Sequence, residues 1–582
     1  MLVLCFAAYN SRSGIYSEGI SPMLSRTVLP FILLSIALSP IALQSARGDQ
    51  GVLVARTDIT GPSLTFDWPA IQIGVGTYEE GPTGITIIRF KNRASVAVDV
   101  RGGAPGTVNT DGLRNAYGTP FTDAIVFTGG SSYGEETITA VATGLKDLGL
   151  RGGDWNSVAF VPGAVIYDLG NRRLNEIYPD KRLAHAALSA LRSGVFPLGA
   201  QGAGRMAMQG GYFGCLAHSG QGAAFRQVGP TKIAAFVVVN AFGAVTDRDG
   251  RLVSCHRAKS WGNLTKISEL LGHLPESLKA DWVASAGDQR NEAGPTRNTT
   301  ISLVITNQKL VPWELQRFAV QVHTSMSRGI QPFSTQSDGD TLFAASTQEV
   351  ENKDLSAITL STIAGELMWD AILASVPEET AFASPATPPN ISAATLAAYA
   401  GRYVFAPPKD AQDMRFGVVG AAIANAEAGA KVLRTVAGGP AAISGVRADD
   451  VITHVDGESL AGLPINQMIA KLRGPVDSTA RLQIARKDQA NAIDVAVVRD
   501  TNKAVLEVRV QDGKLMIEAV GGLNTFEFEA GKPTAVVPSL DATFYVDGRY
   551  HTQIAFTRDT SGRVSGATLN PGPWQQSGMR VD

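Results

Sequence analysis

The chain has 582 residues, about four times the ~150 residues of a typical domain, so several domains are expected. Hydrophobic residues make up 44% and charged residues 18%, which is enough apolar material for globular cores and argues against a disordered chain. The formal net charge is −2, so no overall field attracts nucleic acid or an anionic lipid surface, and we expect no nucleic-acid partner.

The N-terminal segment has the pattern of a secretion signal. Met23 and a nearby arginine precede an almost wholly apolar run over residues 28–43, and small residues follow up to position 48. An uncleaved membrane anchor is the alternative, but the run is short for a span of ~20 residues and contains Pro30 and Pro40. We therefore expect residues 1–48 to be a leader that starts at Met23, and the mature protein to be periplasmic or secreted.

After the leader, residues 52–375 have the alternating pattern of a single α/β unit. Apolar, β-branched runs predict strands at 85–88, 95–98, 124–127, 234–239 and 301–305. Helical spacing predicts helices at 135–148, 184–191, 311–326 and 355–373. In the last of these, apolar residues recur from Leu355 to Ala371 at helical intervals, so one face is expected to be buried.

A different assembly follows a Pro/Ala-rich linker, which we place at residues 376–395. Residues 413–500 resemble a PDZ domain of bacterial proteases, through the sequences Gly439-Pro440-Ala441-Ala442, Gly445 to Ile452 and Val455-Asp456-Gly457. A PDZ domain adds a peptide to a sheet edge and holds its C-terminal carboxylate with loop amides. The resemblance implies a peptide ligand and a carboxylate loop at Phe416, Gly417 and Val418. A PDZ domain that only packs against its neighbours is the alternative.

The sequence on either side of the PDZ-like segment forms one further unit. Residues 396–412 and 501–582 contain short alternating strands, and together they resemble the lipocalin-like β domain appended to some serine β-lactamase-type enzymes. The PDZ domain is therefore predicted to be an insertion within a small β domain.

One local motif indicates a nucleophile. Gly130-Ser131-Ser132-Tyr133-Gly134 fits the G-x-S-x-G elbow between a strand and a helix, with Ser132 as the nucleophile of an α/β-hydrolase. Such an enzyme also needs an acid and a histidine further along the chain. His273 and His323 are available, but neither has a recognisable setting. The alternative is a tight glycine turn that lines a pocket.

A second interpretation depends on motifs spread along the chain. Asn298-Thr299 in front of a strand is unremarkable by itself, as is Asp338-Gly339-Asp340, which resembles a solvated turn. However, residues 55–375 resemble the L-aminopeptidase/D-esterase family (the DmpA-type peptidases), which includes β-peptidyl aminopeptidases and a nylon-oligomer hydrolase. Six ordered motifs carry the resemblance: Thr83–Thr86, Ala97–Thr107, Gly129–Gly134, Val238–Gly243, Asn298–Ile301 and Asp338–Ala344.

The resemblance implies a fold, a processing step and a reaction. The fold is an α/β (α+β) four-layer αββα sandwich resembling the N-terminal-nucleophile hydrolases. The precursor cuts itself between Asn298 and Thr299, and the fragments stay together as oligomers of processed chains. Thr299 then acts as the nucleophile of an aminopeptidase or amidase that hydrolyses N-terminal residues of peptides or related amides and esters. Its new α-amine, with a reference pKa of about 7.7–8.0, is a base close to working pH.

The resemblance also assigns supporting residues. Asn240 matches the oxyanion-stabilising asparagine, Asp338 and Asp340 match the pair that orients the nucleophile, and Tyr133 matches a pocket tyrosine. It implies no cofactor or metal. The sequence departs from many relatives at Gln209, where they carry a lysine before a Gly-Gly pair. This motivates an alternative, a catalytically impaired relative that acts as a PDZ peptide-binding module.

The cysteines add little. Cys5 lies in the leader, and the sequence leaves open whether Cys215 and Cys255 form a disulfide or remain two buried thiols. Neither their spacing nor their neighbours suggest a zinc site.

Overall fold

The computed structural model describes most of the chain after the leader. The described residues are 53–114, 121–154, 156–169, 177–213, 217–254, 266–272, 298–376, 389–405, 417–435, 439–500, 504–522, 528, 533–540, 542–546, 553–570 and 575–581. The predicted leader and both cysteines of the candidate disulfide, Cys215 and Cys255, lie outside them.

Two β-layers of the first domain share one long strand, β3 (Thr83–Val100). The N-terminal half of β3 pairs with β2 (Ile71–Tyr78) and β5 (Phe121–Thr128), and its C-terminal half pairs with β16 (Thr341–Val350). The order of the longer path is β11 (Gln221–Val228), β12 (Thr231–Asn240), β14 (Thr299–Gln308), β16, β3, β5, β6 (Gly163–Val165) and β4 (Thr107–Val108). The sequence predicted two strands within β3, but the structure has one.

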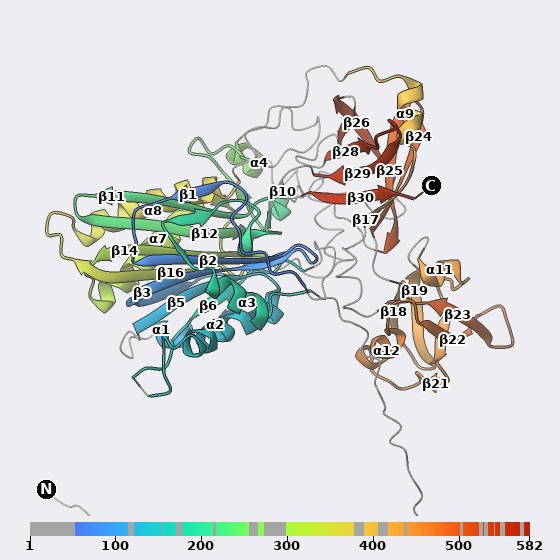
Figure 1. The fold of residues 1–582 in the computed structure, drawn as a ribbon, viewed down its shortest axis with the longest axis horizontal. Helices are drawn as coiled ribbons and strands as arrows, with labels where there is room; N and C mark the ends of the chain where they lie inside the picture. Colours follow the sequence, from blue (N-terminus) through green and yellow to red (C-terminus); the bar gives the residue numbers. More distant parts are fainter. Residues whose placement is uncertain are drawn as a thin grey trace, which may run out of the picture. The chain divides into compact units, whose positions relative to one another are not determined.

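Helices cover the outer faces of these layers (Figure 1). One side carries α7 (Pro312–Ser325) and α8 (Ala357–Ala374), which pack on β12, β14 and β16. The other side carries α2 (Glu136–Asp147) and α3 (Lys181–Ser189), which pack on β3 and β5. Alternate strand residues form the central core between the β-layers; for example, Phe236 and Val238 face inward there, while Val237 and Val239 face α7 and α8. The predicted four-layer αββα architecture is therefore confirmed.

Local sequence explains where the helices begin. Asp180 caps α3 by accepting the Leu183 N–H at 2.9 Å, and Ser356 caps α8 by accepting the Thr359 N–H at 3.2 Å. Pro312 opens α7, where a missing N–H costs nothing.

Among the described residues, α8 is the helix long and apolar enough to cross a membrane; it packs in the core against β11 and β12, as its predicted buried face requires.

Short elements complete this domain. They are the strands β1 (Ser63–Thr65), β7 (Arg192–Ser193), β8 (Val195–Pro197), β9 (Met208–Gln209), β10 (Ala217–His218), β13 (Ala244–Val245) and β15 (Ile330–Gln331), and the helices α1 (Asp111–Arg114) and α4 (Ile267–Gly272). The 3₁₀ helices are η1 (Ser131–Glu135), η2 (Gly202–Gly204), η3 (Gly211–Phe213) and η4 (Met326–Arg328).

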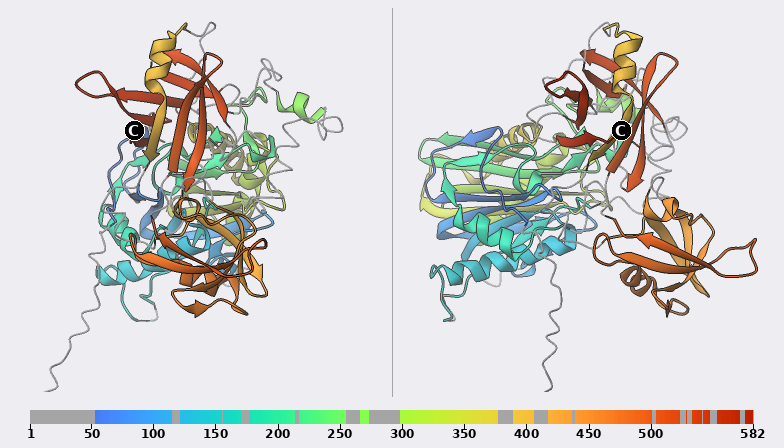
Figure 2. Two further views of the ribbon diagram at one scale, coloured as in Figure 1. Left: turned by 90° about the vertical axis from the view of Figure 1, so that its right-hand side faces the viewer. Right: turned by 45° about the vertical axis from the view of Figure 1, so that its right-hand side comes forward.

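The last part of the chain contains a closed barrel, drawn in red in Figure 2 except for its first strand, which is gold-orange. Its strands are β17 (Gly401–Phe405), β24 (Ala504–Gln511), β25 (Lys514–Gly522), β26 (Thr534–Leu540), β27 (Thr543–Val546), β28 (Gln553–Arg558), β29 (Val564–Leu569) and β30 (Gln576–Arg580). The helix α9 (Ala393–Tyr399) precedes β17, and the Tyr399 ring stacks on Phe556 inside the barrel at a centroid distance of 4.5 Å. Aromatic and aliphatic side chains fill the interior.

Between β17 and β24 in the sequence lies a separate sheet with two helices. Its strands run in the order β18 (Ala421–Ala426), β19 (Gly429–Thr435), β20 (Val451–Val455), β22 (Thr479–Ala485) and β23 (Ile493–Val498), and β21 (Glu458–Ser459) pairs with β20. The helices are α11 (Pro440–Ile443) and α12 (Ile465–Leu472), and the sheet has its own apolar core.

Candidate active site

Four strand ends bring the predicted site residues of the first domain together. Asn240, the last residue of β12, pairs with Thr299, the first residue of β14. Because β14 runs parallel to β16, the segment just before β16 lies at the same edge, and Asn298 forms a bridge with Asp338. The last residue of β3 pairs with Thr341, the first residue of β16. The topology therefore places Thr299, Asn240 and the acid pair at one edge of the sheet.

The peptide bond before Thr299 has a distinct hydrogen-bond pattern in the uncut chain. The Thr299 Oγ1 hydroxyl donates to the carbonyl oxygen of Asn298 at 2.7 Å. The main-chain N–H of Gly339 donates to the same oxygen, also at 2.7 Å. Two donors on one carbonyl polarise it, and the Gly339 N–H can stabilise negative charge that develops on the oxygen. Thr299 is only 4% exposed, so bulk water does not compete for these donors.

Gly339 is a site residue that the sequence interpretation missed. A Cβ at this position would lie 2.7 Å from Thr299 Oγ1 and 2.8 Å from the Ala104 carbonyl oxygen. No side chain fits there without displacing the threonine or the main chain. The only signal in the sequence is the glycine between two acids, and it does not distinguish this close contact from an ordinary turn.

The acid pair is buried and bonded to main-chain donors. Asp338 Oδ1 accepts the Phe242 N–H at 3.1 Å, and Oδ2 accepts the Thr335 N–H at 3.1 Å and the Thr335 hydroxyl at 2.6 Å. Asp340 Oδ1 accepts the Thr300 N–H at 2.7 Å, and Oδ2 accepts the Ser334 N–H at 2.9 Å. Every carboxylate oxygen of the pair therefore holds a main-chain segment beside Thr299.

Burial also changes the protonation of the pair. Loss of solvent, and then the nearby Asp338 charge, raise the pKa of Asp340 to about 8, while main-chain donors oppose the shift. Burial likewise raises the pKa of Asp338. At neutral pH the pair therefore retains a proton.

This proton makes stability depend on pH. An aspartate with a pKa of about 8 in the folded chain and about 3.9 in the unfolded chain takes up a proton on folding between these values. The free energy of unfolding should therefore fall as pH rises from about 4 to about 8, and change no further above it. Urea unfolding of uncut Thr299→Ala protein will measure this slope. Adding Asp340→Asn should reduce this slope by the amount that corresponds to about one bound proton. An unchanged slope would contradict the raised pKa of Asp340.

Asn240 pairs with Thr299 across two strands, and its side-chain amide joins two other main-chain segments. Its Oδ1 accepts the Met208 N–H at 3.0 Å, and its Nδ2 donates to the Tyr167 carbonyl at 3.0 Å. The amide has a second Nδ2 hydrogen, for which the described residues supply no acceptor. That hydrogen is the group able to perform the predicted oxyanion role.

Gln209 is fully buried, and its amide is bonded at both ends. Its Oε1 accepts the Val245 N–H at 3.0 Å, and its Nε2 donates to the Ser254 carbonyl at 2.7 Å and to the Ser254 hydroxyl. A neutral, bonded amide holds β9 against β13 and supplies no positive charge. The structure thus gives Gln209 a positioning contact in place of the charge expected from a lysine.

Tyr133 and Ser132 lie on η1 and are exposed. The Tyr133 side chain is 63% exposed, and its ring lies 5.6 Å from that of Tyr178. No hydrogen bond joins Ser132 to a histidine among the described residues; His323 instead contacts Asp99, and His273 lies outside them. The elbow is therefore a glycine turn without the partners that a serine nucleophile needs.

Asp168, a second residue missed by the sequence interpretation, holds this turn. Its Oδ1 accepts the Gly130 N–H at 2.8 Å, and its Oδ2 accepts the Thr83 hydroxyl at 2.9 Å. The preceding residue, Tyr167, accepts the Asn240 amide. Residues 167–168 thus connect the Tyr133 turn to Asn240. The sequence gives no sign of this contact, because Asp168 is there only a single acid after a short strand.

Residues 63–384 match the model of peptidase family S58. The chain belongs to peptidase family S58. Residues 431–486 also match a PDZ domain model, so the predicted family and PDZ domain are both confirmed. Membership of S58 makes the chain a hydrolase of peptide or amide bonds.

Two curated S58-like relatives show how far the similarity extends. A 6-aminohexanoate-oligomer endohydrolase of Agromyces sp. (strain KY5R) is 41% identical over 322 residues, covering 53% of this chain and 85% of the relative. An uncharacterized aminopeptidase of Mycobacterium leprae (strain TN) is 33% identical over 278 residues, covering 46% and 72%. Both alignments leave a large part of this chain unmatched.

Solved structures include two similar aminopeptidases. The Burkholderia sp. beta-aminopeptidase is 18% identical with a TM-score of 0.38, covering 55% of this chain and 89% of that chain. The L-aminopeptidase D-Ala-esterase/amidase from Ochrobactrum anthropi is 17% identical with a TM-score of 0.39, covering 55% and 87%.

The PDZ domain offers different amides from those predicted. The N–H of Gly417 donates to the Gly474 carbonyl, and the N–H of Val418 donates to the Asp500 carbonyl at 2.9 Å, so both amides are occupied. Phe416 lies outside the described residues. Among the described residues, the amides of Val419 and Gly420 have no acceptor, and they directly precede the edge strand β18.

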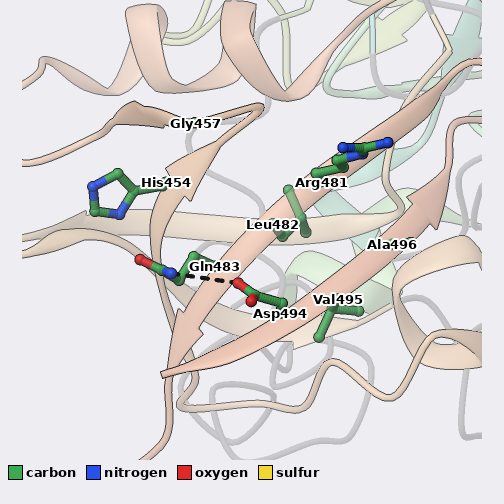
Figure 3. A pocket seen from close by; sticks show the side chains of 8 residues that line it. All are labelled: His454, Gly457, Arg481, Leu482, Gln483, Asp494, Val495 and Ala496. Atoms are coloured by element: carbon green, nitrogen blue, oxygen red, sulfur yellow. Dashed lines mark hydrogen bonds between the residues drawn. The ribbon is translucent and has the colours of Figure 1, made fainter. Parts of the chain in front are cut away.

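A cavity of about 600 Å³ lies elsewhere in the PDZ domain, on β20, β22 and β23 (Figure 3). Its polar lining includes His454, Arg481, Gln483 and Asp494, and Gln483 donates to Asp494 at 3.3 Å. Its lining includes neither β18 nor Val419 and Gly420. The described residues contain no cluster of three or more His, Cys, Asp or Glu side chains that could hold a metal ion.

Proposed function

We propose that the S58 domain cuts its own chain between Asn298 and Thr299 and then hydrolyses amide bonds with Thr299. The observation that carries this proposal is the carbonyl oxygen of Asn298, which lies 2.7 Å from both Thr299 Oγ1 and the Gly339 N–H. The Thr299 hydroxyl, as nucleophile, and the Gly339 N–H, as donor to the oxyanion, are thus both in contact with the buried peptide bond between Asn298 and Thr299.

Self-cleavage proceeds through an ester. Thr299 Oγ attacks the carbonyl carbon of Asn298, and the Gly339 N–H holds the oxyanion. The bond between that carbon and the Thr299 nitrogen breaks, and the nitrogen receives the proton that Oγ gives up. Water then hydrolyses the ester, leaving a carboxylate on Asn298 and a free amine on Thr299.

The same groups serve substrate turnover. The free amine, with a reference pKa of about 7.7–8.0, takes the Thr299 hydroxyl proton during attack on the substrate. Asp340 holds the Thr300 N–H and so fixes the new N-terminus. The substrate carbonyl takes the place of the Asn298 carbonyl at Gly339, and the second N–H of Asn240 completes the oxyanion site.

The acid pair also bears on the substrate. Each of its four oxygens already accepts a main-chain donor and both carboxylates are buried, so a substrate ammonium group would have to share them with those donors. This favours internal amide bonds, and the relative named as a 6-aminohexanoate-oligomer endohydrolase fits that preference. Removal of N-terminal residues from peptides or esters is the alternative, and aminoacyl anilides assayed beside amide oligomers will distinguish the two.

N-terminal sequencing and intact mass of the purified wild-type chain test the proposal. The expected result is a fragment that begins at Thr299, together with amide hydrolysis. A cut chain without hydrolysis would support the impaired relative suggested by the neutral Gln209, and a single uncut chain would overturn the proposal.

We infer that the PDZ domain binds peptide C-termini with the amides of Val419 and Gly420. A peptide with a free carboxylate should bind at least about tenfold more tightly than the same peptide with a C-terminal amide, because only the carboxylate is a charged acceptor. Fluorescence polarisation with the full chain measures both. Equal affinities would overturn the carboxylate assignment, and no binding of either peptide would indicate that the domain only packs against its neighbours.

We also propose that residues 1–48 direct export, and that processed chains assemble as homo-oligomers. The apolar run over 28–43 supports the first proposal. Cell fractionation, compared with a variant carrying Leu33→Arg and Leu34→Arg, tests it; equal distribution of both chains would oppose export. Light scattering of the processed protein tests assembly.

A further inference from the structure

Four consecutive amides at the end of β3 donate to the segment that carries the acid pair. The N–H groups of Arg101 and Gly102 donate to the Asp340 carbonyl at 3.0 and 3.2 Å. The Gly103 N–H donates to the Thr335 carbonyl at 3.2 Å, and the Ala104 N–H donates to the Asp338 carbonyl at 2.8 Å. Residues 101–104, called here the amide strip, therefore hold the main chain of the acid pair.

The two glycines allow this contact. A Cβ on Gly102 would lie 2.2 Å from the Asp340 nitrogen, and a Cβ on Gly103 would lie 2.5 Å from the Gln336 carbonyl oxygen. The Arg-Gly-Gly sequence is thus explained by two main chains in direct contact, not by a turn.

A cluster of charged and polar side chains fixes the start of the amide strip. Asp99 Oδ2 accepts Arg101 Nε at 2.5 Å and His323 Nδ1 at 3.0 Å. Arg101 also donates to the Val320 carbonyl of α7 at 3.2 Å. The strip is therefore joined to α7 through Asp99, Arg101 and His323.

His323 connects the same cluster to the other side of the acid pair. Its ring lies edge-on to Phe333 at a centroid distance of 5.5 Å, and the next residue, Ser334, gives its N–H to Asp340 Oδ2. Burial lowers the pKa of His323, so the imidazole is neutral and Nδ1 carries the hydrogen donated to Asp99.

The other ring nitrogen, Nε2, has no hydrogen-bond partner among the described residues. A buried polar atom without a partner costs about 1–3 kcal/mol, so packing alone does not explain a histidine at this position. The reaction proposed above does not use the ring directly either.

We propose that Asp99, Arg101 and His323 are positioning residues that align the amide strip with residues 335–340 and so place Gly339 and the acid pair against Thr299. This inference rests on the proposed function, because its effect is on the rates of self-cleavage and turnover. The hydrogen bond from His323 to Asp99 is the essential contact, and the ring's packing on Phe333 is secondary.

Two substitutions at His323 separate these contacts. His323→Asn keeps a donor near the Nδ1 position but leaves a gap beside Phe333, whereas His323→Leu keeps apolar volume and removes the donor. The expected result is self-cleavage near the wild-type rate for the asparagine variant and about 10²-fold slower for the leucine variant, since small misplacements cost that much. In the processed leucine variant, kcat should fall with KM unchanged. A packing role predicts the opposite order.

Folding is checked by thermal melting of each variant in an uncut Thr299→Ala background. Asp99→Asn is the further variant if either change at His323 prevents folding; it keeps an acceptor for Nδ1 and should slow self-cleavage less than Asp99→Leu. Equal rates for the leucine and wild-type chains would overturn this inference and leave the proposed function intact. An uncut wild-type chain would instead overturn the proposed function.

Discussion

Thr299→Ala should yield a single uncut chain with no detectable amide hydrolysis. The hydroxyl lies 2.7 Å from the carbonyl oxygen of Asn298, and no other nucleophile of the described residues shares that contact. Loss of a nucleophile in enzymes of this kind lowers kcat by about 10⁴-fold or more. The fold should survive, because the substitution removes one hydrogen bond worth about 1 kcal/mol. Denaturing gels, intact mass and an amide-release assay measure these effects.

Thr299→Ser and Ser132→Ala are the matched controls. Serine retains the hydroxyl and should still give a fragment that begins at residue 299, at a changed rate. Ser132 is exposed and lacks a histidine partner among the described residues, so its alanine variant should be processed and active. Loss of activity in Ser132→Ala with normal activity in Thr299→Ala would restore the α/β-hydrolase interpretation.

The fold was predictable where periodicity is regular. Helix α8 and strand β14 match apolar runs, because burial on one or both faces determines the residues at each step. The runs at 85–88 and 95–98 predicted two strands, since polar residues such as Lys91 and Asn92 interrupt the apolar pattern. In the structure these residues belong to the exposed middle of β3, where the strand passes from one β-layer to the other. Exposure within a continuous strand has no local sequence signal.

The candidate site was predictable only in part. Ordered family motifs indicated Thr299 and Asp340, and the parallel pairing of β14 with β16 explains why residues so distant in sequence meet. Gly339 and Asp168 were missed because their roles depend on main-chain contacts with distant segments. Similarly, residue type alone could not show that both ends of the Gln209 amide are occupied.

Under the proposed function, the amide donors of the uncut chain would serve both self-cleavage and substrate turnover at one site. In self-cleavage the Asn298 carbonyl, held at the Gly339 N–H next to Thr299, would be the first substrate. Once it leaves, the same N–H is free for another carbonyl, and the acid pair stays in place because its partners belong to other segments. The proposed self-cleavage would therefore prepare the site without rearranging it.

Gly339→Ala should accumulate uncut precursor. The new methyl group would lie 2.7 Å from Thr299 Oγ1 and 2.8 Å from the Ala104 carbonyl oxygen, so the hydroxyl or the Gly339 N–H must move away from the Asn298 carbonyl. Removal of one oxyanion donor costs about 10²–10³-fold in rate, and we expect self-cleavage to slow by that factor. The time course of precursor loss on denaturing gels measures it.

Gly112→Ala is the matched control for this change. A Cβ at Gly112, in α1, meets no atom within 4 Å, so alanine should be processed at the wild-type rate and be as stable or slightly more so. Overpacking at Gly339 should cost about 1–3 kcal/mol of stability, which urea unfolding in the Thr299→Ala background can measure separately from rate. Processing of Gly339→Ala at the wild-type rate would show that the added methyl group displaces neither the Thr299 hydroxyl nor the N–H of residue 339, and would contradict this prediction.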